Sequence, residues 1–196
     1  MTVFELLFLT LLATAVSMLV AVARFALGGQ RVRAFTLLRW LVGAAAVYLA
    51  IVAVVGVGTP QRYAARGEPQ CSDDWCIAVV DVERQQRDPS VRYLVTFELS
   101  SRARGAPQRE RMVVAYVRDA AGRRHDAEPD AAAVPFDTLL APRQRVRAQR
   151  MFVAPVGTVI VGLVFTHEGT GAWFPACCII GNDGSLLHKR TLVRLD

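Results

Sequence analysis

The sequence contains almost no lysine, although it is basic overall. Lys189 is the one lysine among 23 basic residues, and the formal net charge is +6. The basic residues form no dense cluster interleaved with aromatic side chains, which is the pattern that nucleic-acid-binding proteins usually show. The four arginines that come closest to a basic patch are Arg102, Arg104, Arg109 and Arg111. They fit either a solvated turn or a surface that binds an acidic partner or anionic headgroups. We therefore expect no nucleic-acid partner.

The sequence motifs of common enzyme and cofactor sites are also missing. There is no Cys-x-x-Cys-His run for haem attachment and no thioredoxin-like Cys-x-x-Cys. Ser185 lacks the Gly-x-Ser-x-Gly context of a hydrolase nucleophile. The run Gly181-Asn182-Asp183-Gly184 is not followed by Lys-Ser or Lys-Thr, so it predicts a turn and not a phosphate-binding loop. We therefore predict a protein that is not an enzyme, with no catalytic residues, cofactor or metal.

What the sequence does contain is two long apolar stretches near its beginning. They cover residues 3–23 and 37–57, and each is close to the roughly 20 residues that a helix needs to cross a bilayer. A cleaved signal peptide has a basic start and a shorter apolar run, whereas this chain has an acidic Glu5 and no base before its first apolar run. We therefore predict that residues 1–58 form a transmembrane helical hairpin.

The link between the two apolar stretches, residues 24–36, is rich in arginine. It contains no acidic residue, and the basic residues in or beside it are Arg24, Arg31, Arg33 and Arg39. Short loops rich in Lys and Arg stay in the cytoplasm. We therefore expect the turn of the hairpin inside the cell, in a bacterial inner membrane. The N-terminus and everything after Gly58 are expected on the periplasmic or outer side.

Small residues recur at helical spacing on both apolar stretches. They are Thr10, Ala13, Ser17 and Ala21 on the first stretch, and Gly43, Ala46, Ala50 and Ala53 on the second. Such stripes let helix backbones approach each other closely, which favours association in lipid. Two interpretations remain open. The two stripes face each other within the hairpin, or at least one of them packs on a partner protein.

The rest of the chain has the length and composition of one globular domain. A polar linker over residues 59–74 is followed by short apolar alternations separated by turn signals. The clearest alternation covers residues 92–101, with one face formed by Tyr93, Val95, Phe97 and Leu99. About seven strands are predicted, over residues 75–83, 92–101, 112–118, 123–126, 145–153, 158–166 and 192–195. This spacing is typical of an Ig-like antiparallel β-sandwich, which we place at residues 75–196.

One run of this domain resembles a known group of domains. Residues 135–142 read Pro-Phe-Asp-Thr-Leu-Leu-Ala-Pro, and a polar strand then leads to Phe152-Val153-Ala154-Pro155. This order resembles Ig-like domains found outside the bacterial membrane, in which a leucine-proline turn precedes a strand that ends in phenylalanine and a second turn. The sequence departs from them at Arg143, where they usually have glycine. The resemblance implies an extracytoplasmic Ig-like fold and no particular activity.

All four cysteines follow the apolar stretches: Cys71, Cys76, Cys177 and Cys178. An even number of cysteines on the oxidising side of a membrane favours disulfides. Two bridges between the early pair and the late pair would join the linker to the loop before the last strand, and a local Cys71–Cys76 bridge is the other option. Metal binding by these cysteines is the alternative, although Cys-x4-Cys and Cys-Cys spacing is unlike a zinc ribbon.

Residues 165–190 form a connection that is too long for a plain loop. It carries Trp173 and Phe174 close to the two late cysteines. Aromatic residues in such a loop fit either a cap on the sandwich core or a contact surface for another protein.

Together these patterns predict a non-catalytic accessory or structural subunit anchored in the lipid bilayer. It would bind or stabilise a larger membrane protein complex, for example a respiratory or photosynthetic electron-transfer assembly. The expected partner contacts are the two small-residue stripes, Trp173 and Phe174. The alternative function is a periplasmic copper- or zinc-handling or thiol-redox protein that uses the four cysteines and His167 or His188.

Overall fold

The computed structural model describes residues 3–167, 176–180, 185 and 187–195. The chain forms two compact units, and each contains two separate parts of the sequence. The first unit is Met1–Pro60 with Thr170–Lys189, and the second is Gln61–Gly169 with Arg190–Asp196. The sequence placed residues 170–189 in the sandwich, whereas the described residues of this segment, 176–180, 185 and 187–189, belong to the first unit.

The first unit contains two long helices, α1 (Val3–Leu27) and α2 (Arg31–Gly58). Both are long and apolar enough to cross a membrane. They extend beyond the predicted apolar stretches, so the expected loop over 24–36 is reduced to residues 28–30. Arginine is a good helix former, and Arg24 lies in the last turn of α1, where a cation interacts well with the helix dipole. The chain reverses at Gly29, whose φ of 76° favours glycine.

The two helices pack against each other along one face each. The buried and half-buried positions recur at helical spacing on both helices. They include Phe8, Leu12, Ala15, Met18 and Phe25 on α1, and Ala34, Leu37, Leu41, Tyr48, Val52 and Gly56 on α2. We call these two faces the packed face of the hairpin. Most other apolar side chains of the helices are exposed.

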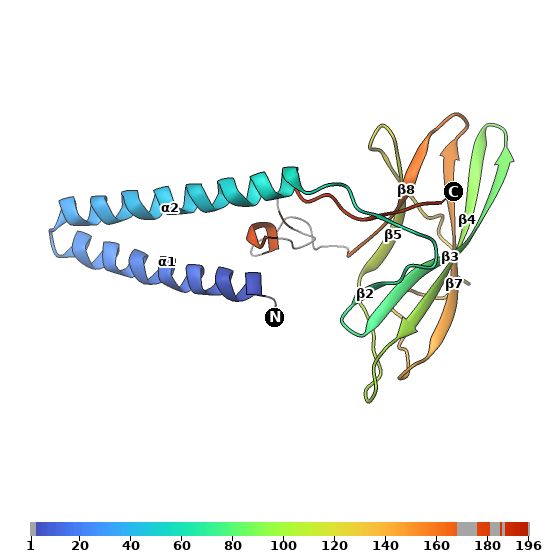
Figure 1. Cartoon of the computed structure of the whole chain (residues 1–196), viewed down its shortest axis with the longest axis horizontal. Coiled ribbons are helices and arrows are strands. Elements are labelled where there is room, and N and C mark those ends of the chain that lie inside the picture. Colours follow the sequence, from blue (N-terminus) through green and yellow to red (C-terminus); the bar gives the residue numbers. More distant parts are fainter. Residues whose placement is uncertain (1–2, 168–175, 181–184, 186, 196) are drawn as a thin grey trace. The chain divides into compact units, whose positions relative to one another are not determined.

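The second unit consists of two β-sheets (Figure 1). One sheet has the strand order β1-β9-β8-β5-β6, and the other has the order β2-β3-β4-β7. The pairing is antiparallel except between β1 and β9, which are parallel. The strands are β1 (Tyr63–Ala64), β2 (Gln70–Ser72), β3 (Trp75–Arg87), β4 (Ser90–Ser101), β5 (Val113–Asp119), β6 (Arg124–Asp126), β7 (Arg145–Pro155), β8 (Ile160–His167) and β9 (Leu192–Val193).

The seven strands expected from the sequence correspond to β3–β9, with ends displaced by a few residues. The structure adds β1 and β2, which lie in the stretch expected to be a linker. β1 pairs with β9, and β2 pairs with the start of β3. Each is only two or three residues long, so neither produces an alternation that a sequence pattern can show. The linker expected over 59–74 therefore contributes to both sheets.

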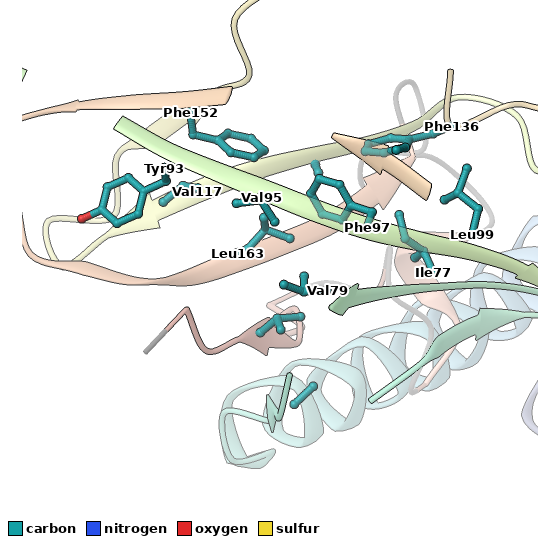
Figure 2. Close-up of a cluster of buried hydrophobic side chains, with 14 of the residues drawn as sticks. Ile77, Val79, Tyr93, Val95, Phe97, Leu99, Val117, Phe136, Phe152 and Leu163 are labelled. Carbon is teal, nitrogen blue, oxygen red and sulfur yellow. The ribbon is translucent and has the colours of Figure 1, made fainter. Parts of the chain in front are cut away.

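The core of the second unit is built around β4, which has strands paired on both of its edges. Its buried face consists of alternate residues, each at most 8% exposed: Val91, Tyr93, Val95, Phe97 and Leu99. The ring of Phe97 lies edge-on to Phe136 at 5.1 Å and to Phe165 at 5.8 Å. Figure 2 shows four of these β4 side chains, those of Tyr93, Val95, Phe97 and Leu99, together with Val117 and Leu163 of the other sheet. Burial of these side chains is the main source of stability for this unit.

The turn before β7 contains an unusual backbone conformation. Arg143 has a φ of 63°, in the left-handed region that non-glycine residues seldom adopt. This is the position at which the Ig-like domains that the sequence resembles usually have glycine. The turn thus has a geometry that suits glycine, although this chain has arginine there.

Candidate functional site

The small-residue stripes of the two helices point away from the packed face of the hairpin. Their exposed members are Thr10, Ala13 and Ser17 on α1, and Gly43, Ala46 and Ala50 on α2, whereas Ala21 and Ala53 are half-buried. At about 100° per residue, the centre of the α2 stripe lies roughly 160° around the helix from the packed face. The six exposed stripe residues therefore take no part in the packing of the two helices against each other.

The stripe on α2 is open at its glycine. A Cβ atom added to Gly43 would meet nothing within 4 Å. Glycine is a poor helix former, and here its lack of a side chain serves no contact within the described part of the chain. The surface of α2 at Gly43 is therefore open, and the helix backbone there is uncovered by a side chain.

The hydroxyl groups on α1 are satisfied by the helix backbone. Thr10 Oγ1 donates a hydrogen bond to the Leu6 carbonyl at 2.9 Å, and Ser17 Oγ donates to the Ala13 carbonyl at 2.9 Å. Such bonds to the residue four positions earlier allow a hydroxyl to lie on an apolar helix without an unpaired polar group. These residues are therefore compatible with an apolar surrounding of lipid or protein.

Cys71 and Cys76 form a disulfide. The two residues are directly opposite each other in the β2–β3 hairpin, which places their side chains on one face at short distance. Of the two disulfide pairings that the sequence left open, this is the local one. The long-range bridges to Cys177 and Cys178 are not formed, because both late cysteines are free thiols.

Cys177 and Cys178 lie in a short 3-10 helix, η1 (Ala176–Cys178), which belongs to the first unit. Their Sγ atoms are 3.1 Å apart. The Tyr48 hydroxyl on α2 donates a hydrogen bond of 2.6 Å to the Cys178 carbonyl. Burial, together with the hydrogen bond and charge of Cys177, raises the pKa of the Cys178 thiol to about 11. We call Cys177 and Cys178 the vicinal thiol pair.

The histidines take part in other arrangements. His167 Nε2 lies 2.9 Å from Glu110 Oε1, and the His188 backbone amide donates to the Ser185 carbonyl. Within the described ranges, no three His, Cys, Asp or Glu side chains are grouped so that they could hold a metal ion. Trp173 and Phe174, expected to contact a partner, lie outside the residues that the structure describes.

A buried carboxylate at the end of β5 was not predicted from the sequence. Asp119 is 2% exposed. Its carboxylate accepts hydrogen bonds from the Arg123 backbone amide at 2.8 Å and from Arg123 Nε at 2.7 Å, and it lies 3.1 Å from His125 Nε2. Burial alone would raise the pKa of Asp119, but the bonds from His125 and Arg123 outweigh it and lower that pKa to about 2. This group closes the β5–β6 hairpin.

The outer face of the second sheet has a shallow groove of about 530 Å³. Its polar lining includes Asp81, Glu83, Thr96, Asp130, Arg147 and Gln149. Thr96 belongs to the face of β4 opposite the core, and its hydroxyl accepts a hydrogen bond of 3.1 Å from Gln149. The lining combines three carboxylates with one guanidinium and offers no nucleophile paired with a base.

No protein-family model matches this chain, and no curated protein matches it. Among solved structures, it is similar to an uncharacterized β-sandwich protein from Clostridium difficile 630, known from a crystal structure. The two sequences are 9% identical, the TM-score is 0.45, and the match covers 70% of this chain and 96% of that chain. The similarity concerns the β-sandwich architecture and implies no activity.

Proposed function

We propose that this protein is a non-catalytic accessory subunit that is anchored in a bacterial inner membrane and binds another membrane protein. In this proposal α1 and α2 cross the bilayer as a hairpin with its arginine-flanked turn in the cytoplasm. The second unit, an Ig-like sandwich, lies on the periplasmic or outer side. A larger complex, such as an electron-transfer assembly, is the proposed host.

The observation that best supports this function is the direction of the two small-residue stripes. A hairpin that serves only as a tether can use its small residues to bring its own two helices together. Here the helices pack mainly through a different face, and six of the eight stripe residues are left exposed. Because lipid tails are as apolar as the helices, close packing of small residues is what favours association between membrane helices.

Affinity purification tests this proposal. The full chain with a C-terminal tag would be extracted from native membranes in a mild detergent, and the proteins recovered with it would be quantified by mass spectrometry. We expect at least one membrane protein to be enriched in a fixed ratio to the tagged chain. Recovery of a monomer without any enriched membrane protein would contradict the proposed function.

A matched pair of variants separates the stripe from the rest of the helix surface. Ala46→Leu places a bulky side chain in the α2 stripe, whereas Ala44→Leu makes the same change on an exposed position outside it. We expect Ala46→Leu to reduce recovery of the partner about tenfold, which corresponds to a loss of about 1.4 kcal/mol. Ala44→Leu should leave recovery unchanged. Equal recovery with both variants would exclude the stripe as the contact surface.

A further inference from the structure

The vicinal thiol pair is placed for reaction between its own two sulfur atoms. A disulfide bond has a length of about 2.05 Å, and the Sγ atoms of Cys177 and Cys178 are already 3.1 Å apart. Both cysteines are half-buried, so they are neither sealed in a core nor fully open to solvent. The Cα atoms of adjacent residues are about 3.8 Å apart, less than the usual 4.4–6.8 Å of a disulfide, so closing the remaining distance of about 1 Å forms a strained bond.

Two contacts hold the segment that contains this pair against α2. The Tyr48 hydroxyl donates to the Cys178 carbonyl at 2.6 Å. Farther along the chain, Lys189 Nζ donates to the carbonyls of Val57 and Thr59, at 2.9 and 3.1 Å, near the C-terminal end of α2. A side chain of α2 therefore fixes the Cys178 backbone, and the side chain of Lys189 binds backbone carbonyls at the end of the same helix.

The two sulfurs are not equivalent. Burial raises the pKa of Cys178 to about 11, and Cys177 contributes to that rise through its hydrogen bond and charge. Cys178 is therefore the sulfur that keeps its proton, and we assign the first attack to the other sulfur of the pair, that of Cys177. Since the thiolate is the reactive form of cysteine, this asymmetry assigns different roles to the two residues.

We propose that Cys177 and Cys178 form a thiol–disulfide exchange site that reduces a disulfide bond of another molecule. The Cys177 thiolate attacks one sulfur of the substrate disulfide, a mixed disulfide forms, and the other substrate sulfur leaves as a thiolate that takes up a proton. Cys178 then loses its proton and attacks the Cys177 sulfur. This step forms the Cys177–Cys178 bond and releases the second substrate thiol. The substrate gains two electrons and two protons, and the pair loses them.

This site goes beyond the proposed accessory function and does not depend on it. The test uses the purified full chain in mild detergent, with glutathione disulfide as the probe. After reaction, free thiols are blocked and the chain is digested with trypsin. Because arginines separate Cys71 and Cys76 from the vicinal thiol pair, the two pairs fall on different peptides and are read independently by mass spectrometry.

We expect the wild-type chain to form the Cys177–Cys178 disulfide and to release two glutathione thiols per chain. Cys178→Ser should stop at a mixed disulfide on Cys177, and Cys177→Ser should react at least tenfold more slowly. The proposal would be overturned by separate glutathione adducts on both cysteines of the wild type, by no reaction, or by equal reaction rates of the two serine variants.

Tyr48→Phe tests the positioning role of the tyrosine hydroxyl. The change removes one hydrogen bond and leaves both sulfurs in place. We expect the first step at Cys177 to keep its rate and the second step to slow several-fold, so that mixed disulfide accumulates. Tyr63→Phe, in the second unit, is the matched control and should behave as the wild type. Identical kinetics for both phenylalanine variants would remove Tyr48 from the site.

Discussion

The two units of this protein treat apolar side chains in opposite ways. In the second unit, Phe97 and Leu99 are completely buried between two sheets. In the first unit, the equally apolar residues Val47 and Val54 of α2 are 61% and 70% exposed. Burial from water stabilises the sandwich by itself. The hairpin leaves most of its apolar side chains exposed, and contiguous apolar surfaces of this kind mark membrane or protein interaction sites.

The same comparison separates two surfaces within the hairpin. The packed face joins α1 to α2, and the small-residue stripes lie on the other side of each helix. Packing inside the hairpin therefore needs none of the exposed stripe residues. What distinguishes the stripes from the rest of the exposed helix surface is their small size, which suits contact with another backbone better than contact with lipid chains.

The largest effect should come from the sandwich core. Phe97→Ala removes a fully buried ring that contacts Phe136 and Phe165, and we expect it to lower the free energy of unfolding by about 3–5 kcal/mol. Phe35→Ala on α2, where the ring is 69% exposed, should change it little. Urea unfolding of the full chain in detergent measures both. Similar losses for the two variants would contradict the difference between the units.

The two cysteine pairs provide a second contrast. Replacing Cys71 and Cys76 together by serine opens a disulfide with a sequence separation of 5, and the chain-entropy relation gives a loss of about 2 kcal/mol. Cys177→Ser should not destabilise the protein measurably, because its thiol is free. The same unfolding experiment applies. A loss near 4.7 kcal/mol for the double variant would instead indicate a bridge that closes a loop of about 100 residues.

Acid should affect the sandwich before the helices. The pKa of Asp119 lies at about 2 in the folded protein, below its ordinary value of 3.8. A lowered folded-state pKa contributes stability that is fully present above about pH 3.8 and is lost as the pH falls through about 2. Asp119→Asn should therefore be less stable than the wild type at neutral pH, and this difference should shrink between pH 4 and pH 2. A constant difference across that range would exclude the ionised carboxylate as its source.

The smallest effect is expected at the turn before β7. Arg143→Gly relieves the left-handed conformation of Arg143, but glycine also makes the unfolded chain more flexible. The net gain in stability should be at most about 1 kcal/mol. Arg147→Gly within β7 should instead destabilise the sandwich, because glycine weakens the interior of a strand. If Arg143→Gly lowered the stability of the protein, the Arg143 side chain would contribute more to stability than its left-handed backbone conformation costs.

Much of the fold could be predicted from local patterns. The alternation of Tyr93, Val95, Phe97 and Leu99 correctly indicated the buried face of β4. The two apolar stretches correctly indicated the two helices. The ends of the helices were not predicted, because residues with good helix propensity continue each helix beyond its apolar stretch. Arg24, for example, is still part of α1.

The features that sequence patterns missed depend on distant residues. β1 is defined by its pairing with β9, from Tyr63 to Leu192, and no local signal reports such a pairing. The Cys71–Cys76 bridge follows from the register of β2 with β3, which could not be assigned while β2 was treated as a linker. The direction of the stripes depends on which face of each helix packs, and both faces are apolar.

Photocrosslinking in intact membranes tests the central claim most directly. A photoreactive amino acid would replace Ala46 in one variant and Ala44 in another, and both would be irradiated before any detergent is added. The accessory-subunit account predicts a discrete protein adduct at position 46 that is absent or much weaker at position 44. No protein adduct at position 46, or equal adducts at both positions, would contradict it.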